Sequence, residues 1–119
     1  LIDPPYELKD DYGRVVDCIK DSLSRFSTGT YLVWYPLLQR PEPLAMVDAL
    51  KKLQPNNWLN VSLSIEAPNA DGFGMFGSGM MIINPPWTLP KVLESTMPIL
   101  CDTLAIDDNA NFTLSHNIS

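Results

Sequence analysis

Cysteine and histidine are scarce in this sequence. Its 119 residues include two cysteines, Cys18 and Cys101, which lie far apart, and one histidine, His116. The cysteines lack the close spacing of zinc ligands, and one pair is too few for a disulfide scaffold. No acidic residue is placed to orient His116, which argues against a hydrolase triad. The sequence therefore predicts neither a metal site nor a disulfide-stabilised fold.

Basic residues and long hydrophobic runs are also few. The chain has 8 Lys and Arg against 14 Asp and Glu, and its net charge is −6 at pH 7. This excludes a broad basic surface for a phosphate backbone, but not a local basic rim. The longest purely apolar runs are about five residues, far below the ~20 that span a bilayer. No signal peptide is visible, so we expect a cytoplasmic protein with no membrane partner.

The sequence does contain enough apolar residues, 45% of the chain, to bury the core of one modest domain. Three- and four-residue apolar spacing predicts helices, and short β-branched or aromatic runs predict strands. We expect Pro36 to end one strand and Pro98 to kink or split the last helix. The predicted helices cover residues 10–26, 40–53 and 88–104, and the predicted strands cover residues 1–2, 30–35, 58–66 and 80–83, with a further short strand at 112–114.

The order of these elements predicts the fold class. Two strand–helix–strand units imply parallel strands with right-handed crossovers. The last two main strands are joined by a loop without a helix, so they should pair antiparallel. We therefore expect an α/β protein with an open, mostly parallel sheet and one antiparallel strand. In such sheets ligands bind beyond the carboxyl ends of the parallel strands.

The segment Asp3-Pro4-Pro5-Tyr6 follows the first strand. It suits transfer to an exocyclic amino nitrogen of a base, whose lone pair is delocalised into the ring. The Asp3 carboxylate and the Pro4 carbonyl can accept the two N–H bonds of that nitrogen and stabilise developing positive charge. The prolines fix the turn, and Tyr6 offers a flat face to an extruded base. The alternative is an ordinary turn that ends a strand.

Several further motifs occur in a fixed order along the chain. They are LIDPPYE at residues 1–7, DY at 11–12, TGTY at 28–31, VWYP at 33–36, GSGM at 77–80 and NPPW at 84–87. Together they resemble the carboxyl-terminal half of the ribosomal RNA large-subunit methyltransferase J family, over residues 1–104. Members of this family are also described as proteins involved in the catabolism of external DNA.

The resemblance implies a class I, Rossmann-like methyltransferase sheet. It also implies an S-adenosylmethionine-dependent enzyme that methylates N6 of an adenine in 23S ribosomal RNA. By the same resemblance, Asp3 is the catalytic acceptor and lies against the cofactor, while Pro4, Pro5 and Tyr6 complete the target-base site. RNA is therefore the expected partner.

The family's amino-terminal half, with its glycine-rich cofactor loop, has no counterpart in these residues. We therefore expect residues 1–104 to be the carboxyl-terminal half of a catalytic domain, and residues 105–119 to be a tail of uncertain role. We expect the missing amino-terminal half to be a partner of this chain, which by itself should be inactive.

Two other segments imitate functional motifs. Asn84-Pro85-Pro86-Trp87 resembles the Asp3 motif, but an antiparallel strand before it would place it at the opposite edge of the sheet. We interpret it as a turn, with Trp87 packed in the core. Residues 72–77 match the dinucleotide pattern G-x-G-x-x-G, but a strand follows them where that pattern needs a helix.

Further substrate-binding candidates lie near the expected carboxyl edge of the sheet. The antiparallel pairing places the loop before residue 80 on the Asp3 side, where Phe73, Phe76 and Ser78 are candidates to line the substrate or cofactor mouth. Tyr35 ends a strand on that side, and Arg40 lies close behind it. The alternatives are a flexible loop, a core position for Tyr35 and a solvated Arg40.

Three alternatives to RNA methylation stay open. Methylation of adenine in DNA uses the same Asp-Pro-Pro-Tyr pattern. A non-catalytic protein that binds nucleic acid for the use of external DNA would not need Asp3. An inert fragment of a larger fold would have no activity of its own.

Overall fold

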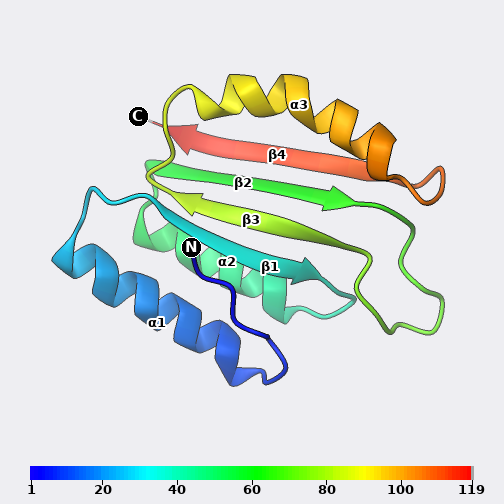
Figure 1. The fold of residues 1–119 in the computed structure, drawn as a ribbon. Helices are drawn as coiled ribbons and strands as arrows, with labels where there is room; N and C mark the ends of the chain where they lie inside the picture. The colour runs from blue at the N-terminus through cyan, green and yellow to red at the C-terminus, as the bar shows by residue number, and fades with distance from the viewer. Residues whose placement is uncertain (119) are drawn as a thin grey trace.

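Seven helices and strands make up the part of the chain that the computed structural model describes, residues 1–118 (Figure 1). Their order is the one predicted from the sequence. The elements are α1 (Asp10–Arg25), β1 (Tyr31–Leu37), α2 (Glu42–Leu53), β2 (Asn57–Ser64), β3 (Gly77–Ile83), α3 (Leu89–Leu104) and β4 (Asn111–Ile118).

The four strands form one sheet in the order β1-β3-β2-β4, and every neighbouring pair is antiparallel. The expectation of a mostly parallel sheet is therefore wrong. β1 and β2 run in the same direction, since both are antiparallel to β3. However, β3 turns back and enters the sheet between them, so the two strands do not pair with each other (Figure 1). The predicted antiparallel pairing of β2 with β3 is confirmed.

The first residues of the chain lie along the outer edge of β1. Ile2 forms a parallel bridge with Val33. Its N–H donates to the Leu32 carbonyl at 2.7 Å, and its own carbonyl accepts from the Trp34 N–H at 3.0 Å. Alternate residues of a strand direct their backbone groups to the same side, so Pro36 turns its missing donor toward this open edge. For this reason β1 continues through Pro36. The expectation that Pro36 ends this strand is therefore wrong.

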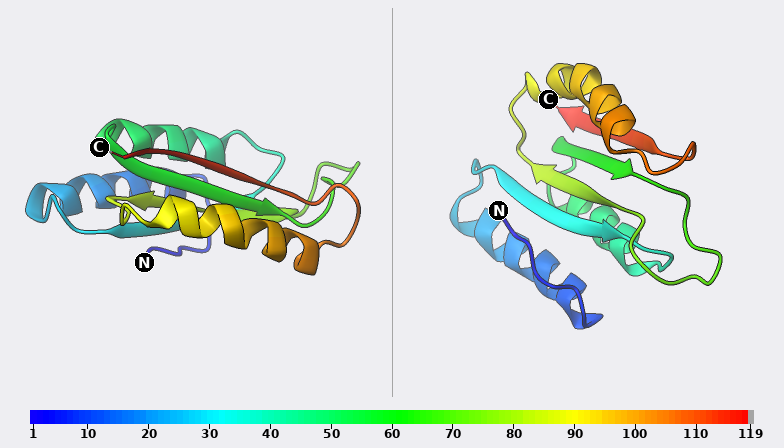
Figure 2. Two further views of the ribbon diagram at one scale, coloured as in Figure 1. Left: turned by 90° about the horizontal axis from the view of Figure 1, so that it is seen from above. Right: turned by 45° about the vertical axis from the view of Figure 1, so that its right-hand side comes forward.

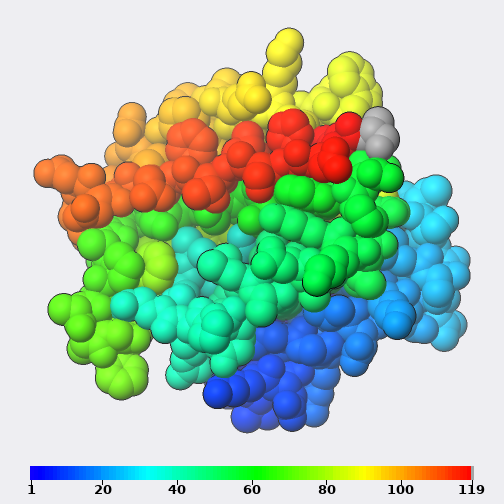
Figure 3. Space-filling model, turned by 180° about the vertical axis from the view of Figure 1, so that it is seen from behind, coloured from blue at the N-terminus to red at the C-terminus, as the bar shows by residue number. Residues whose placement is uncertain are grey.

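Helices cover the two faces of the sheet unequally. α1 and α2 pack side by side on one face, whereas α3 lies on the opposite face over β2 and β4 (Figure 2). Figure 3 shows the first face, with α2 in the middle and α1 beside it. The core under these two helices includes Ile19, Leu50, Val33 and Ile83, all with no exposed surface. Each such aliphatic side chain stabilises the fold by about 1.5–3 kcal/mol.

The expectation that Trp87 packs in the core is wrong. Trp87 is 82% exposed and does not pack in the core. Pro85 and Pro86 carry the chain away from β3, and α3 meets the rest of the fold through Pro90 and Met97, not through the residue before the helix. Pro98 lies inside the continuous helix α3 and does not split it, while a kink at Pro98 stays a prediction. Pro98 is on the exposed side of the helix, where water can reach the carbonyl that loses its N–H partner.

The described residues end in the strand β4, where the sequence had suggested at most three residues of strand. β4 pairs along its length with β2, from Asn57 opposite Ile118 to Ser64 opposite Asn111. Phe112 and Leu114 are half-buried, and their neighbours Thr113 and Ser115 are exposed. This alternation is typical of an edge strand with one covered face, and here α3 covers it.

Candidate active site

Asp3 stands at the carboxyl end of the amino-terminal strand stub. Because Ile2 pairs in parallel with β1, Asp3 lies toward the same edge of the sheet as the carboxyl end of β1. Asp3 and Pro5 are exposed, and Pro4 is half-buried. The Asp3 carboxylate is therefore accessible to a ligand, while the two prolines restrict the backbone behind it.

Tyr6 turns from this segment into the protein. Its backbone has φ 56°, in the left-handed region, and its side chain is 5% exposed. The hydroxyl donates to the Trp34 carbonyl at 2.5 Å. The ring centroid lies 4.7 Å from that of Tyr12 and 6.2 Å from that of Trp34. Burial, followed by the neighbouring Tyr12 and Asp3, raises the pKa of the Tyr6 phenol well above its ordinary value of 10.0, so it remains a neutral donor at pH 7.

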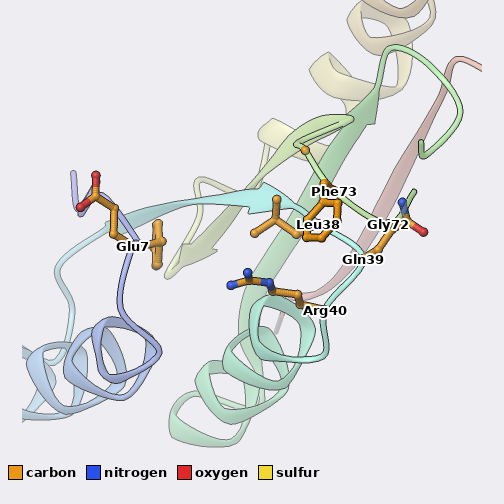
Figure 4. A pocket seen from close by; sticks show the side chains of 8 residues that line it. Glu7, Leu38, Gln39, Arg40, Gly72 and Phe73 are labelled. Atoms are coloured by element: carbon orange, nitrogen blue, oxygen red, sulfur yellow. The ribbon is translucent and has the colours of Figure 1, made fainter. Parts of the chain in front are cut away.

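A pocket of about 300 Å³ opens beside Tyr6 (Figure 4). Three separate segments build it: the end of the Asp3 motif with the residue that follows it, the loop from β1 to α2, and the loop from β2 to β3. The lining residues are Tyr6, Glu7, Leu38, Gln39, Arg40, Gly72, Phe73 and Gly74. The loop between β2 and β3 thus reaches the Asp3 side of the sheet, which confirms the prediction from antiparallel pairing.

Arg40 and Phe73 bring a cation and an aromatic ring to this pocket from different loops (Figure 4). Phe73 is 73% exposed. Its N–H donates to the Asp71 carboxylate at 2.9 Å, and its carbonyl accepts from the Asn69 side chain at 3.0 Å. These bonds order the backbone at the tip of the loop and so fix the position from which the exposed ring projects.

Gln39 links the two loops of the pocket, a role that the sequence analysis missed. Its amide nitrogen donates to the Asn69 carbonyl at 2.7 Å. The only signal in the sequence was its position between the end of a predicted strand and Arg40, where ligand-binding residues of α/β proteins often lie. Leu38 and Glu7, also in the lining, carried no separate signal.

Three of the predicted substrate-binding residues lie elsewhere. Tyr35 is fully buried, and its hydroxyl donates to the Asn60 side chain at 2.5 Å. Burial raises the pKa of this phenol to about 12. Its ring lies against Gly79, where a Cβ would come within 2.1 Å of the ring. Tyr35 therefore occupies the core.

Phe76 and Ser78 line two other hollows. Phe76 lies beside the start of β4, in a hollow that Asn109 and Asn111 also line. Ser78 lies in an apolar groove under α3, with Trp34 and Met97. The structure does not bring either residue to the pocket beside Tyr6, and their roles toward substrate stay predictions.

Asn84 lies at the opposite end of the sheet, as the sequence predicted. β3 ends where β1 begins, because Ile83 pairs with Tyr31. The Asn84 amide nitrogen donates to the carbonyls of Ser27 and Gly29 at 2.9 and 2.8 Å, and its oxygen accepts from Gln54 at 3.0 Å. The side chain is used within the fold, which supports its interpretation as a structural turn.

Within residues 1–118, no group of three or more His, Cys, Asp and Glu side chains is arranged to hold a metal ion. No helix in the same range has both the length and the apolar character needed to cross a membrane.

Similarity to characterised sequences covers almost the whole chain. A family model described as "Ribosomal RNA large subunit methyltransferase D, RlmJ" matches residues 1–116. "Ribosomal RNA large subunit methyltransferase J" of Haemophilus influenzae is 41% identical over 114 residues, which cover 96% of this chain and 40% of the relative. The Escherichia coli protein of the same name is 38% identical over 115 residues, covering 97% of this chain and 41% of the relative.

A solved structure shares the fold. The crystal structure of a Legionella pneumophila protein superposes with a TM-score of 0.87 at 28% identity, over 98% of this chain and 42% of that protein. The chain thus spans about two-fifths of the length of the proteins that it matches. The match to the family model runs past residue 104, where the resemblance in the motifs ended, and includes most of β4. The chain belongs to the ribosomal RNA large subunit methyltransferase J family.

Proposed function

We propose that this chain carries the catalytic motif of an enzyme that transfers a methyl group to N6 of an extruded adenine in 23S ribosomal RNA. The observation that carries the proposal is the exposed Asp3 carboxylate, on a proline-fixed segment that leads into the Tyr6 pocket. Membership of the methyltransferase J family supports the same reaction class. A cytoplasmic location, where ribosomal RNA is processed, is part of the proposal.

Asp3 and Pro4 act on the amino group of the target base. The Asp3 carboxylate and the Pro4 carbonyl accept the two N–H bonds of the amino nitrogen. This withdraws the nitrogen lone pair from conjugation with the ring and offsets the positive charge that appears as the new bond forms. The exposure of Asp3 leaves its oxygens available for this contact. The prolines hold the acceptors in place, so little entropy is lost on binding.

The pocket supplies the other requirements for binding an RNA nucleotide. Its volume, about 300 Å³, lies at the lower end of the range of small-molecule sites. The exposed Phe73 ring presents an apolar surface of the kind on which bases stack. Arg40 provides a cation that can contact a phosphate at this pocket, although the net charge of the chain is negative.

Asp3 is also the described residue that fits contact with S-adenosylmethionine. The cofactor carries cationic groups, and an exposed carboxylate at the end of a strand suits them. When bound, S-adenosylmethionine supplies an electrophilic methyl group. Residues 72–77 are not proposed as its binding loop, because β3 follows them and no helix N-terminus is presented there.

We also propose that the uncovered half of the sheet packs against an amino-terminal half of the same domain. α3 lies mainly over β2 and β4 on its side, and a groove lined by Trp34, Met80, Met97 and Leu100 opens beside it. The longer length of the relatives supports such a partner segment. On this proposal the chain by itself is inactive.

The decisive experiment replaces Asp3 in the natural full-length protein. Asp3→Ala removes an acceptor of the amino N–H bonds, so methyl transfer should fall by about 10²–10⁴-fold with little loss of stability. The measurement is N6-methyladenosine formed in 23S RNA, quantified by nucleoside mass spectrometry. Asp102→Ala, which removes an exposed carboxylate on α3, is the matched control and should be as active as the wild type.

Near-normal methylation by the Asp3→Ala protein would overturn the catalytic role. Competition between RNA and DNA substrates separates the two nucleic acids, and preferential methylation of DNA would overturn the RNA assignment. Binding of nucleic acid that responds neither to Asp3 nor to the methyl donor would instead indicate a non-catalytic protein for the use of external DNA.

A further inference from the structure

The Asp3 segment is fastened to β1 at both of its ends. Before Asp3, Ile2 exchanges two backbone hydrogen bonds with Leu32 and Trp34. After Pro5, the Tyr6 hydroxyl donates to the Trp34 carbonyl. Trp34 therefore holds the near end through its N–H and the far end through its carbonyl. Asp3 lies on the short bridge between these anchors.

The Tyr6 ring has little accessible surface to offer a base. Its side chain is 5% exposed, and it packs with the rings of Tyr12 and Trp34 at centroid distances of 4.7 and 6.2 Å. Tyr12 is itself 7% exposed, so a base cannot displace it without opening the core. In the same pocket Phe73 is 73% exposed, so another segment of the lining offers an accessible aromatic surface.

The backbone of Tyr6 depends on these contacts. A bulky residue with φ 56° lies in a region that L-residues disfavour, and such a conformation persists only where the surroundings determine it. Here the surroundings are the hydroxyl bond to Trp34 and the ring of Tyr12. The Tyr12 hydroxyl has no hydrogen-bond partner within the described residues, so Tyr12 acts on Tyr6 through its ring.

We propose that Tyr6 is a positioning residue, whose hydroxyl on the Trp34 carbonyl fixes the Asp3-Pro4-Pro5 bridge, and that it is not the surface on which the target base stacks. The inference rests on the proposed function for its catalytic consequence. Without the hydroxyl bond, the far end of the bridge is held only by the packing of the Tyr6 ring, and the Asp3 carboxylate and Pro4 carbonyl are positioned less firmly. A small displacement of catalytic groups is enough to slow a reaction by about 10²-fold.

The test is Tyr6→Phe in the natural full-length protein, assayed with a fragment of 23S RNA. This variant keeps the aromatic ring and removes the anchor. A positioning role predicts that kcat falls about 10–100-fold while KM for RNA stays within about twofold. A stacking role predicts nearly normal kcat, because the phenyl ring stacks as well as the phenol. Normal kcat for Tyr6→Phe would therefore overturn the inference.

Tyr31→Phe is the matched control. The Tyr31 hydroxyl also donates to backbone carbonyls, those of Phe26 at 2.8 Å and Ser22 at 3.1 Å. It lies at the other end of β1, beside Ile83. Loss of its hydroxyl should lower the thermal unfolding midpoint, as Tyr6→Phe does, but leave kcat unchanged. An equal fall of kcat in both variants would mean that lost stability, and not position, explains the effect.

Amide hydrogen exchange tests the anchor without an activity assay. The peptide that covers residues 1–8 should exchange faster in Tyr6→Phe than in the wild type, and at the wild-type rate in Tyr31→Phe. Unchanged exchange in Tyr6→Phe would overturn the positioning role. If Tyr6→Phe does not fold, Tyr12→Leu keeps the hydroxyl and removes the ring behind it, and should also speed exchange in this peptide. Absence of methylation by the wild type would instead refute the proposed function, while the exchange result still decides whether Tyr6 is an anchor.

Discussion

Two segments with nearly the same letters have opposite uses in this protein. Asp3-Pro4-Pro5-Tyr6 exposes its polar first residue and buries its aromatic last one, at 5% exposure. In Asn84-Pro85-Pro86-Trp87 the polar first residue is bonded within the fold, and the aromatic last one is 82% exposed. Each segment has one residue with positive φ, Tyr6 at 56° and Asn84 at 54°. In each segment, the residue with positive φ is the one whose side chain forms hydrogen bonds within the fold.

The direction of the strand before each segment accounts for the difference. Asp3 follows a stub that runs parallel to β1, whereas Asn84 follows β3, which runs the other way. The two segments consequently lie at opposite edges of the sheet. At the Asp3 edge the loops after β1 and before β3 build a pocket. At the Asn84 edge the amide finds the backbone carbonyls that follow α1. A shared sequence pattern therefore does not imply a shared function.

The comparison predicts its largest effect on stability at Asn84. Asn84→Ala removes three side-chain hydrogen bonds and places alanine at a positive φ that asparagine tolerates better. We expect a loss of about 2–4 kcal/mol in the free energy of unfolding, measured by urea denaturation. Asp3→Ala, by contrast, should cost little, since the Asp3 side chain is exposed.

Asn84→Gly separates the two causes of that loss. Glycine adopts positive φ without strain, so this variant should lose the hydrogen bonds alone and be about 1 kcal/mol more stable than Asn84→Ala. An Asn84→Ala protein as stable as the wild type would contradict the structural role of Asn84, because its side chain would then be available for another role.

The next largest effect on stability is expected at alkaline pH, and it should arise at the edge that contains Tyr6 and not at the edge that contains Asn84. Burial raises the pKa of the Tyr6 and Tyr12 phenols above 10.0 in the folded protein. Their contribution to stability is therefore complete below pH 10 and is lost as pH rises above it, because the unfolded chain releases these protons first. The Asn84 amide does not titrate.

The measurement is the free energy of unfolding as a function of pH in the wild type and in Tyr6→Phe. The wild type should lose stability more steeply above pH 10, since it has one more buried phenol to ionise. Identical slopes in the two proteins would show that Tyr6 is not buried as described.

The smallest effect is expected at Trp87. Because its side chain is largely exposed, Trp87→Ala should change the free energy of unfolding by no more than about 0.5 kcal/mol. Chemical denaturation of the natural full-length protein measures this. A loss of about 2 kcal/mol or more would show that a segment outside residues 1–118 packs on Trp87. Tyr6 and Trp87 would then each hold a different segment of the protein.

Local patterns predicted most of the elements. The apolar spacing of residues 10–26 locates α1 to within one residue, and the aromatic, β-branched run after residue 30 locates β1. Strand pairing was harder, since it depends on where β3 enters the sheet. No pattern in the residues of β1 or β2 indicates that β3 lies between them. For this reason the expectation of a mostly parallel sheet was wrong.

The candidate site was predicted in part. The place of Asp3 at a strand end, and that of the loop around Phe73 on the same side, follow from chain direction alone. The burial of Tyr35 and the positions of Phe76 and Ser78 do not, because alternate residues of a strand face opposite sides and a shift of one residue exchanges them. Gln39 escaped notice because its link to Asn69 joins segments that are distant in sequence.

By itself the sequence determined the helices and strands, the restriction of the backbone by Pro4 and Pro5, and the family through motifs that keep a fixed order. These depend on neighbouring residues and on side-chain chemistry. Only the tertiary structure decided that the sheet pairs antiparallel, that Tyr6 is buried while Trp87 is exposed, and that the pocket joins Arg40 to Phe73. Contacts of this kind form between segments far apart in the chain, and their energies depend on partners that no local pattern specifies.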